Sequence, residues 1–282
     1  GVVTQPDRPA GRGQKLSESP VKRFALGAGL PIIQPPRLRE PEALEQLAAW
    51  RPDLIVVAAF GQILKPAVLD LPRYGCLNVH ASLLPRWRGA APIAAALLAG
   101  DPATGVTLMQ MDPGLDTGPL LAQRSEAIRP DDTTPALTAR LAELGAALLA
   151  DCLPAYLRGE LRPEPQDPAR ATYAPQLTKE AGRLDFAQPA RDLDRRVRAM
   201  LPWPAAFAVW QGQPLKVLRA APLEALPPGA LPGVVFLADQ GPAVACGQGA
   251  LLLQEVQPAG KSPMPAAAFA RGARQFVGSR LE

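Results

Sequence analysis

The first 158 residues alternate between segments that favour strands and segments that favour helices, and this alternation limits the fold more than any other feature. One strand segment, residues 52–60, is an unbroken apolar run that is typical of a strand covered on both faces. Alternation of this kind predicts an α/β fold with a doubly wound, mostly parallel, Rossmann-like sheet. We expect strands over 1–4, 52–60, 75–82 and 104–111, and helices over 19–29, 41–50, 91–100 and 133–157.

Helix ends are marked by ordinary capping signals. Ser19 precedes Pro20, which predicts an N-cap followed by the first helical residue, and Gly29 then marks the end of that helix. Thr134 stands before a proline at the start of the longest helical segment, whose leucines recur at helical spacing. Gly100 ends the helix that begins near residue 91.

The pattern changes after residue 158. Residues 159–178 are rich in proline without amphipathic periodicity, which indicates a linker that crosses a surface. Residues 179–282 hold one short helix and several short strands separated by Gly and Pro turns, which predict a small antiparallel β-barrel of the OB type. We therefore expect a catalytic domain over 1–158, a linker over 159–178 and a C-terminal domain over 179–282.

Composition excludes several classes of protein. No apolar run reaches the roughly 18 residues that a membrane span requires, and no signal peptide opens the sequence, so the cytoplasm is the expected location. The three cysteines, Cys76, Cys152 and Cys246, are far apart and lack a CxxC pair, which argues against a disulfide framework or a zinc site. The single histidine, His80, argues against a histidine-based metal cluster.

Basic residues are unevenly distributed along the sequence. Residues 1–178 carry 18 basic and 18 acidic side chains, whereas residues 179–282 carry 12 basic and 8 acidic ones, so the net charge of +4 belongs to the C-terminal part. Residues 1–39 hold seven Lys or Arg and only two acidic side chains. These two basic regions are compatible with a polyanionic partner, although charge alone is as well explained by an ordinary solvated surface.

Polar residues follow the strand expected over 75–82. Asn78 and His80 are two residues apart, so on a strand both side chains emerge from the same face. Asp112 and Asp116 follow the next strand, and the groups converge if the two strands are parallel neighbours. A histidine that titrates near neutrality, an aspartate beside it and an amide donor suit acyl transfer to an amine.

A structural explanation of the same residues stays open at this point. A single histidine beside a strand is often a buried residue whose hydrogen bonds are satisfied, and Asn78 can bond a neighbouring loop. Asp112 and Asp116 precede residues that are common in turns. Spacing alone therefore does not separate the catalytic interpretation from the structural one.

Longer motifs distinguish the catalytic interpretation from the structural one. "NVHASLLPRWRGAAPI", followed by "TGVTLMQMDPGLDTG", resembles the formyltransferase family that uses 10-formyltetrahydrofolate. The resemblance covers essentially the whole chain, from "TQPDRPAGRGQKL" to "VQPAGKSPM", and is strongest to members that act on methionine esterified to initiator tRNA. It implies transfer of the formyl group to the α-amino group of that methionine, with no metal. The expected partners are the initiator tRNA and the folate, and the expected state is a monomer without a membrane contact.

The resemblance also implies roles for single residues. Asn78, His80 and Asp116 match the catalytic group, so Asp116 is preferred to Asp112. The stretch Ser82, Leu83, Leu84 and Pro85 matches the wall of the folate pocket, and residues 60–65 match a segment beside the pterin. Phe60 stands where many members have tyrosine, so no catalytic role is expected for it.

Several basic residues match the tRNA contacts of the family. Arg8, Arg12, Lys15 and Lys22 lie in or beside a long loop that is expected to enter the acceptor stem, and Arg12 is the first choice. Lys179 matches a lysine near the tRNA, and the basic C-terminal domain fits a groove for the tRNA backbone. Trp203 is expected to pack in the core or the linker rather than to stack on a base.

Three alternatives and one gap remain. A formyltransferase for a nucleotide or amino-sugar amine, a formylfolate hydrolase and a non-catalytic tRNA-binding relative share parts of this pattern. The family also opens with one strand–helix unit ahead of the segment that begins at Gly1. We expect that unit to belong to the natural protein, because a sheet without it would lose a central strand.

Overall fold

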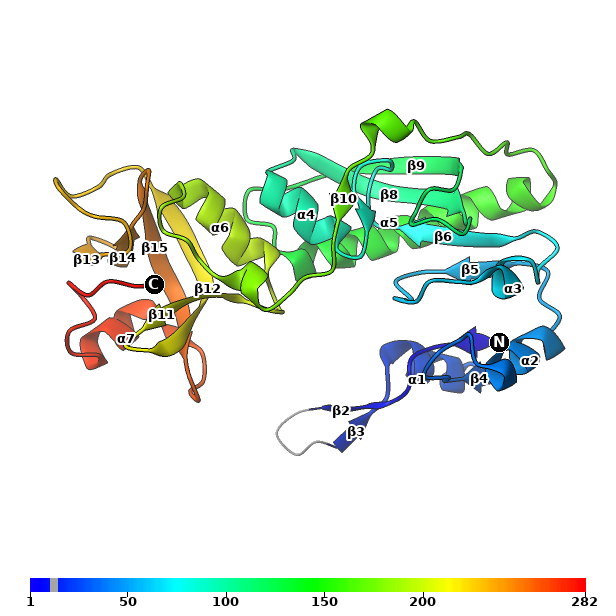
Figure 1. Ribbon diagram of the computed structural model, residues 1–282, viewed down its shortest axis with the longest axis horizontal. Coiled ribbons are helices and arrows are strands. Elements are labelled where there is room, and N and C mark those ends of the chain that lie inside the picture. The colour runs from blue at the N-terminus through cyan, green and yellow to red at the C-terminus, as the bar shows by residue number, and fades with distance from the viewer. Residues whose placement is uncertain (11–14) are drawn as a thin grey trace. The chain divides into compact units, whose positions relative to one another are not determined.

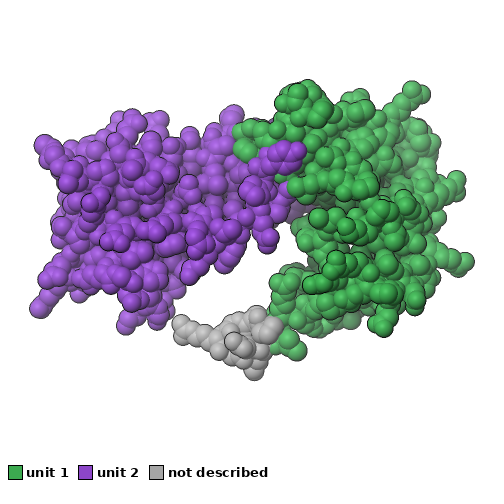
Figure 2. Space-filling model, viewed as in Figure 1, with its two compact units in different colours: residues 1–88, 106–124, 144–172 green, residues 89–105, 125–143, 173–282 purple. Residues whose placement is uncertain are grey.

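The computed structural model describes residues 1–10 and 15–282, except for the side chains of residues 9, 10 and 15. The chain divides into two compact units (Figure 2). Unit 1 comprises residues 1–88, 106–124 and 144–172, and unit 2 comprises residues 89–105, 125–143 and 173–282. Within the described residues, no helix combines the length and the apolar character needed to cross a membrane.

The N-terminal part of unit 1 contains a short parallel pair of strands, β1 (Val2–Val3) and β4 (Ile32–Ile33), with helix α1 (Pro20–Gly27) between them in sequence. The side chain of Ser19 accepts a hydrogen bond from the backbone N–H of Lys22, so the predicted N-cap is confirmed. The other elements here are β2 (Arg8–Ala10), β3 (Lys15–Ser17), α2 (Pro41–Ala49) and α3 (Pro66–Leu69).

A four-stranded sheet positions the candidate site (Figure 1). Its order is β5 (Ile55–Val57), β6 (Cys76–His80), β8 (Ala103–Gln110) and β9 (Leu120–Ala127). Strands β5 and β6 are parallel, whereas β6 and β8 are antiparallel. The expected neighbours are therefore correct, but the expected parallel direction of the second pair is wrong. Strand β9 was not predicted, because its residues, LLAQRSEA, do not alternate between polar and apolar although exposure alternates along its second half.

The α/β class is confirmed, while the mostly parallel single sheet is confirmed only in part. The two parallel pairs, β1–β4 and β5–β6, lie in separate sheets, and strands β8 and β9 extend the second sheet. Strand β5 is consequently at an edge of its sheet, and Val56 is 43% exposed. The expectation that this strand is covered on both faces is wrong, because the face that carries Val56 is exposed.

Helix α5 (Thr134–Leu157) packs against the face of the sheet that is opposite to Asn78 and His80. A Cβ atom at Gly145 would lie only 2.8 Å from Cγ1 of Val79, so glycine is what allows the helix to approach the strand closely. The helix bounds match the sequence prediction. Helix α4 (Pro92–Ala99) ends at Gly100 in the left-handed conformation, also as predicted.

The C-terminal part of unit 2 is one antiparallel sheet with the order β11-β12-β15-β14-β13, and β16 also pairs with β15. The end strands β11 and β13 do not pair with each other, so the sheet is open and the closed barrel expected from the sequence is not formed. The bounds are β11 (Ala206–Trp210), β12 (Gln213–Leu223), β13 (Val235–Ala238), β14 (Gly241–Ala245), β15 (Ala250–Pro258) and β16 (Met264–Pro265).

Helix α6 (Ala190–Ala199) and helix α7 (Ala266–Gly272) pack on this sheet and close its core. Leu193 and Val197 of α6 are fully buried there, and Trp210, Phe269 and Phe276 meet edge to face. Trp203 lies outside this core with 57% of its surface exposed, so the expectation that it packs in the core or linker is wrong. The remaining short elements are β7 (Arg88–Gly89), η1 (Pro168–Arg170), β10 (Tyr173–Ala174) and η2 (Glu180–Gly182).

Candidate active site

Strand β6 presents Asn78 and His80 on one face, as their spacing predicts. Asn78 is opposite Met109 of β8 and His80 is opposite Thr107, so the antiparallel ladder fixes both positions. Both side chains are nearly removed from solvent, with 9% of Asn78 and 6% of His80 exposed. Two polar side chains at this depth require partners, because an unpaired buried polar group is costly.

The imidazole of His80 is held from both sides. Its Nε2 atom lies 2.9 Å from the carbonyl oxygen of Trp87, and a carbonyl oxygen can only accept, so Nε2 carries the proton of that bond. The hydroxyl of Ser82 donates to the same oxygen. The other ring nitrogen, Nδ1, lies 3.8 Å from Oδ2 of Asp116. In the neutral ring, Nδ1 is therefore the nitrogen that is free to accept a proton.

Asp116 completes a three-residue cluster in unit 1. Nδ2 of Asn78 donates to its Oδ1 atom over 3.3 Å, while its Oδ2 atom faces His80. The residue has a φ angle of +51°, a left-handed conformation that few residues other than glycine adopt. A conformation of this kind persists only where neighbouring contacts hold it, and such positions are frequent at functional sites.

Asp112 has a different task in the same loop. Its carboxylate accepts hydrogen bonds from the backbone N–H of Gly114 and from the hydroxyl of Thr117, which is 2.7 Å from Oδ1 and 2.9 Å from Oδ2. This arrangement is an Asx turn that shapes the loop. The structure thus separates the two aspartates: Asp112 forms the turn, and Asp116 faces Asn78 and His80.

The cluster forms although β6 and β8 are antiparallel. In this pairing the last residue of β8, Gln110, lies beside Leu77 at the start of β6. The loop that follows must then return along β6 for Asp116 to reach His80. Its return is anchored by a hydrogen bond from the N–H of Gln110 to the carbonyl of Pro119, and a Cβ atom at Gly118 would collide with the Gln110 carbonyl.

The segment after His80 is braced by Thr107 and Gln123. The Thr107 hydroxyl donates to the carbonyl of Ser82 over 2.6 Å and accepts from the N–H of Leu84, and Gln123 donates to both Thr107 and the Leu84 carbonyl. Ser82 and Leu84 are buried, whereas Leu83 and Pro85 are partly exposed. Sequence reasoning missed the brace, although Thr107 is a polar residue within an apolar strand, which is a visible signal.

The tRNA-binding candidates lie on both units. Arg8 and Lys179 are exposed, Arg12 lies outside the described residues, and Lys15 is described only as backbone of β3. Lys22 is not freely available to a phosphate. Its Nζ atom donates to Asp7 over 2.6 Å and lies 3.3 Å from Glu18, and these bonds raise the pKa of Lys22. Phe60 is half-buried against the core cluster around Leu47.

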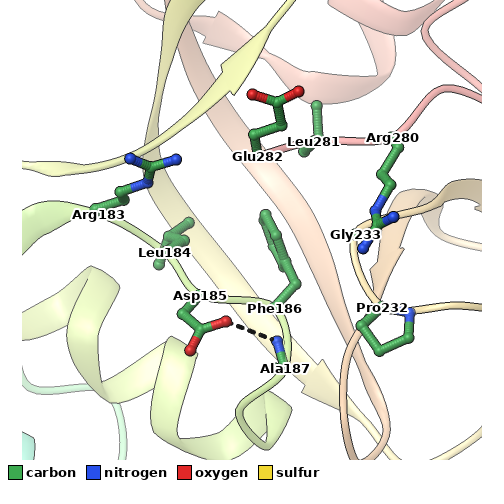
Figure 3. Close-up of a pocket in the computed structure, with 10 residues that line it drawn as sticks. All are labelled: Arg183, Leu184, Asp185, Phe186, Ala187, Pro232, Gly233, Arg280, Leu281 and Glu282. Carbon is green, nitrogen blue, oxygen red and sulfur yellow. Dashed lines mark hydrogen bonds between the residues drawn. The ribbon is translucent and has the colours of Figure 1, made fainter.

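A hollow of about 430 Å³ lies in unit 2. Figure 3 shows the guanidinium groups of Arg183 and Arg280 on opposite sides of it, with the ring of Phe186 between them. Asp185 accepts from the N–H of Ala187 and shapes one wall. The other lining residues are Leu184, Pro232, Gly233, Leu281 and Glu282.

Thiol and metal chemistry are not offered by the described cysteines and acidic groups. All three cysteines are free, and burial raises the pKa of Cys76 and of Cys246 to about 11. A thiol with such a pKa is almost entirely protonated near neutral pH and is a poor nucleophile. In the parts of the chain that the structure describes, no group of three or more His, Cys, Asp or Glu side chains is placed to hold a metal ion.

The geometry of the cluster supports proton transfer next to a developing negative charge. His80 exposes one nitrogen for a proton, Asp116 provides a carboxylate beside it, and Asn78 provides amide N–H groups.

The sequence matches two family patterns that together cover most of the chain. The pattern described as formyl transferase matches residues 1–153, and the pattern of the formyl transferase C-terminal domain matches residues 176–274. A methionyl-tRNA formyltransferase of Thiobacillus denitrificans is 54% identical over 284 residues, covering 99% of this chain and 90% of the relative. One of Roseiflexus sp. is 49% identical over 281 residues, covering 100% and 86%, respectively.

Solved structures share the fold at much lower identity. HypX from Aquifex aeolicus in complex with tetrahydrofolic acid aligns with a TM-score of 0.64 and 22% identity, covering 84% of this chain and 42% of that one. An N-formyltransferase from Helicobacter canadensis, in complex with folinic acid and dTDP-3-aminofucose, aligns with a TM-score of 0.64 and 16% identity, covering 89% and 87%.

Proposed function

The chain belongs to the formyl transferase family, and from this we propose that it transfers a formyl group from 10-formyltetrahydrofolate to the α-amino group of methionine on initiator tRNA. Two relatives support this proposal. Both are methionyl-tRNA formyltransferases, and each is about half identical to this chain along nearly its whole length. The observation that carries the proposal is the clustering of Asn78, His80 and Asp116 at the positions that the motifs assign to catalysis.

The proposed reaction forms one C–N bond and breaks another. The methionine nitrogen attacks the formyl carbon, the carbonyl oxygen becomes negative, and the bond to the folate nitrogen N10 then breaks. The proton that the amine loses is accepted at Nδ1 of His80 and is returned to N10, so the reaction needs no external acid or base. Asn78 and protonated His80 stabilise the oxyanion, and Asp116 stabilises the imidazolium.

The folate is assigned to the partly exposed residues of the segment after His80. Leu83 and Pro85 would contact it, while Ser82 and Leu84 are buried and would act by holding the backbone in place. The fit rests on a rigid, mostly apolar wall beside buried polar groups, which is the usual construction of a small-molecule site. The folate supplies the activated formyl group, and the protein supplies positioning and proton transfer.

The tRNA is assigned to basic residues of the N-terminal loop and of the C-terminal part. Arg8, Arg12 and Lys15 would contact phosphates through the loop, and Lys179 with the excess basic charge of residues 179–282 would contact the tRNA backbone. We further propose that the open C-terminal sheet is OB-like and binds nucleic acid. The proposed functional parts are a catalytic domain over 1–158, a linker over 159–178 and a C-terminal domain over 179–282. We also propose that the protein acts as a monomer in the cytoplasm.

A formylation assay with defined acceptors tests the proposal. Methionyl initiator tRNA, unesterified methionine and an amino-sugar nucleotide are each incubated with 10-formyltetrahydrofolate, and formylated product is measured. We expect product only with the tRNA. Activity restricted to the sugar nucleotide would overturn the assigned acceptor, and release of formate without an acceptor would indicate a hydrolase.

Arginine substitutions distinguish the tRNA assignment from the folate assignment. Arg12→Ala is expected to raise KM for the tRNA while KM for the folate stays unchanged. The slope of log KM for the tRNA against log salt concentration should become shallower by about one. Equal values of KM for the tRNA in Arg12→Ala and wild type would remove this residue from the interface.

A further inference from the structure

Gln166 links the loop of Asp116 to a buried arginine in unit 1. Nε2 of Gln166 donates to the carbonyl oxygen of Asp116 over 2.8 Å and to that of Gly118 over 2.7 Å. Its Oε1 atom accepts from Nε of Arg88 over 3.0 Å and from Nη2 over 2.7 Å. One side chain, from a segment that the sequence indicated only as a linker, therefore reaches the backbone of a catalytic candidate.

All four hydrogen-bonding positions of this amide are used. Both amide hydrogens meet carbonyl oxygens, and the oxygen meets two guanidinium N–H groups, so the reverse orientation of the amide would place donors against donors. Arg88 is only 4% exposed, and its charge strengthens the adjacent amide donors. The orientation of Gln166 is thus fixed by its surroundings rather than by its own rotamer preference.

A glutamine serves here where a glutamate would seem the better partner for a buried arginine. A carboxylate at position 166 would form a stronger pair with Arg88, because charge-assisted hydrogen bonds are the stronger ones. It would, however, have no hydrogen to donate to the carbonyls of Asp116 and Gly118. Only an amide can donate to these two carbonyls, so the choice of glutamine indicates that its main role is to hold the loop rather than to pair with the arginine.

The carbonyl that Gln166 holds belongs to the residue with the unusual backbone conformation. Asp116 has a φ angle of +51°, and fixing its carbonyl oxygen fixes the peptide plane that follows its Cα atom. The direction of the side chain toward Asn78 and His80 depends on that backbone conformation. The segment of Gln166 is itself anchored, because Glu164 and Leu120 exchange two backbone hydrogen bonds of 2.8 Å.

We propose that Gln166 is a positioning residue that acts through Asp116 by holding its backbone in the left-handed conformation that aims the carboxylate at Asn78 and His80. The proposal rests on the assigned formyl transfer, in which Asp116 is placed beside His80. Arg88 orients the amide, Gln166 orients the carbonyls, and Asp116 acts next to the reacting atoms. Gln166 does not contact the substrates.

The sharpest test is Gln166→Glu in the full chain. The substitution retains the shape of the side chain and its bonds to Arg88 but removes both donors to the loop. We expect kcat to fall at least tenfold, KM for the tRNA and the folate to stay within threefold, and the thermal midpoint to be retained. The matched control is Gln46→Glu, which makes the same chemical change at an exposed position of α2 and should leave kcat within twofold.

A double-mutant cycle separates positioning from a general structural effect. In a chain that already carries Asp116→Asn, Gln166→Glu should lower kcat less than threefold further, because the carboxylate through which it acts is gone. A purely structural role predicts the same fold loss in both backgrounds together with a lower thermal midpoint. Equal losses, or an unchanged kcat in the single variant, would overturn the proposal.

A second measurement does not depend on activity, so it tests the role of Gln166 even if the proposed function is wrong. Amide hydrogen exchange of residues 114–118 should be at least tenfold faster in Gln166→Glu than in wild type, with little change in residues 76–80. Unchanged exchange in the loop would show that Gln166 does not hold it, whatever the enzyme acts on. Absence of product from wild type with every acceptor would instead count against the proposed function alone.

Discussion

Nδ1 of His80 faces Oδ2 of Asp116 across 3.8 Å, while the opposite nitrogen of the same ring is held by the backbone carbonyl of Trp87. The two ring nitrogens therefore have different tasks. One nitrogen anchors the imidazole, and the other is the proposed site of proton exchange on a side chain that is only 6% exposed.

His80→Ala removes the proposed proton acceptor. We expect kcat to fall by about 10²–10⁴-fold, because general acid–base catalysis contributes that much, while the Kd for the tRNA stays unchanged. Steady-state formylation and a tRNA-binding titration check the two expectations. An unchanged kcat would exclude His80 from the chemistry.

Asp116→Asn and Asp112→Asn make the same chemical change at two positions of one loop. Asp116→Asn keeps an oxygen for Asn78 but loses the negative charge beside His80, so we expect kcat to fall by about 10²-fold or more. Asp112→Asn keeps an acceptor for Gly114 and Thr117, so kcat should stay within threefold. The assignment of the two aspartates would be reversed if the larger loss occurred at position 112.

Thr107→Val tests the brace below the proposed folate wall. The substitution keeps the shape of a fully buried side chain but leaves the Ser82 carbonyl and the Leu84 N–H without their partner. We expect the free energy of unfolding to fall by about 2–6 kcal/mol, since each of the two unpaired groups costs about 1–3 kcal/mol, and KM for the folate to rise. Thr138→Val on an exposed face of α5 is the control, and both variants are measured by urea denaturation.

Asp132 in unit 2 is expected to contribute to stability in acid. The Arg140 guanidinium donates to both of its oxygens over 2.7 Å, and this bond, with the N–H of Arg129, lowers the pKa of Asp132 below its usual value. A lowered pKa contributes stability that is complete above the unfolded value of about 3.9 and is lost as pH falls through the folded value.

Asp132→Asn should therefore reduce stability at pH 7 and make its decline between about pH 5 and pH 2 shallower than in wild type. Urea midpoints measured at several pH values in this range check the expectation. Asp131→Asn, at the exposed neighbouring position, should follow the wild-type curve. A parallel decline in wild type and Asp132→Asn would show that this carboxylate does not set the acid limit.

Local signals predicted the ends of several helices well. Ser19 caps α1, Gly100 ends α4 in the left-handed conformation, and the bounds of α5 follow from Thr134 and the leucine spacing. Each of these features depends on residues that lie within a few positions of one another. The motifs likewise identified Asn78, His80 and Asp116, which the structure brings together.

The direction of β8 could not be predicted in the same way. Apolar periodicity identifies a strand but is identical when read in either direction, so the antiparallel pairing with β6 leaves no trace in the pattern. The parallel geometry expected for the site is therefore wrong, and Asp116 reaches His80 because its loop turns back. The open C-terminal sheet was mistaken for a closed barrel for a similar reason, since closure depends on whether the end strands meet.

The role of Gln166 was hidden by its surroundings in the sequence. Residues 159–178 have no helical or strand periodicity, and the contacts of Gln166 are 48, 50 and 78 positions away in the chain. Arg88 belongs to a recognised motif, but nothing in that motif indicates which residue its guanidinium meets. Only the folded arrangement connects the two.

The contacts that Gln166 makes with Arg88 and the Asp116 loop also affect the order in which the protein folds during synthesis. Arg88 and Asp116 leave the ribosome long before Gln166, which is 50 positions beyond Asp116. Closing such a distant contact is slow compared with forming a local turn, so the loop that carries Asp116 acquires its last support late. A nascent chain that ends before residue 166 can contain every residue of the three-residue cluster and still lack the contact that aims its carboxylate.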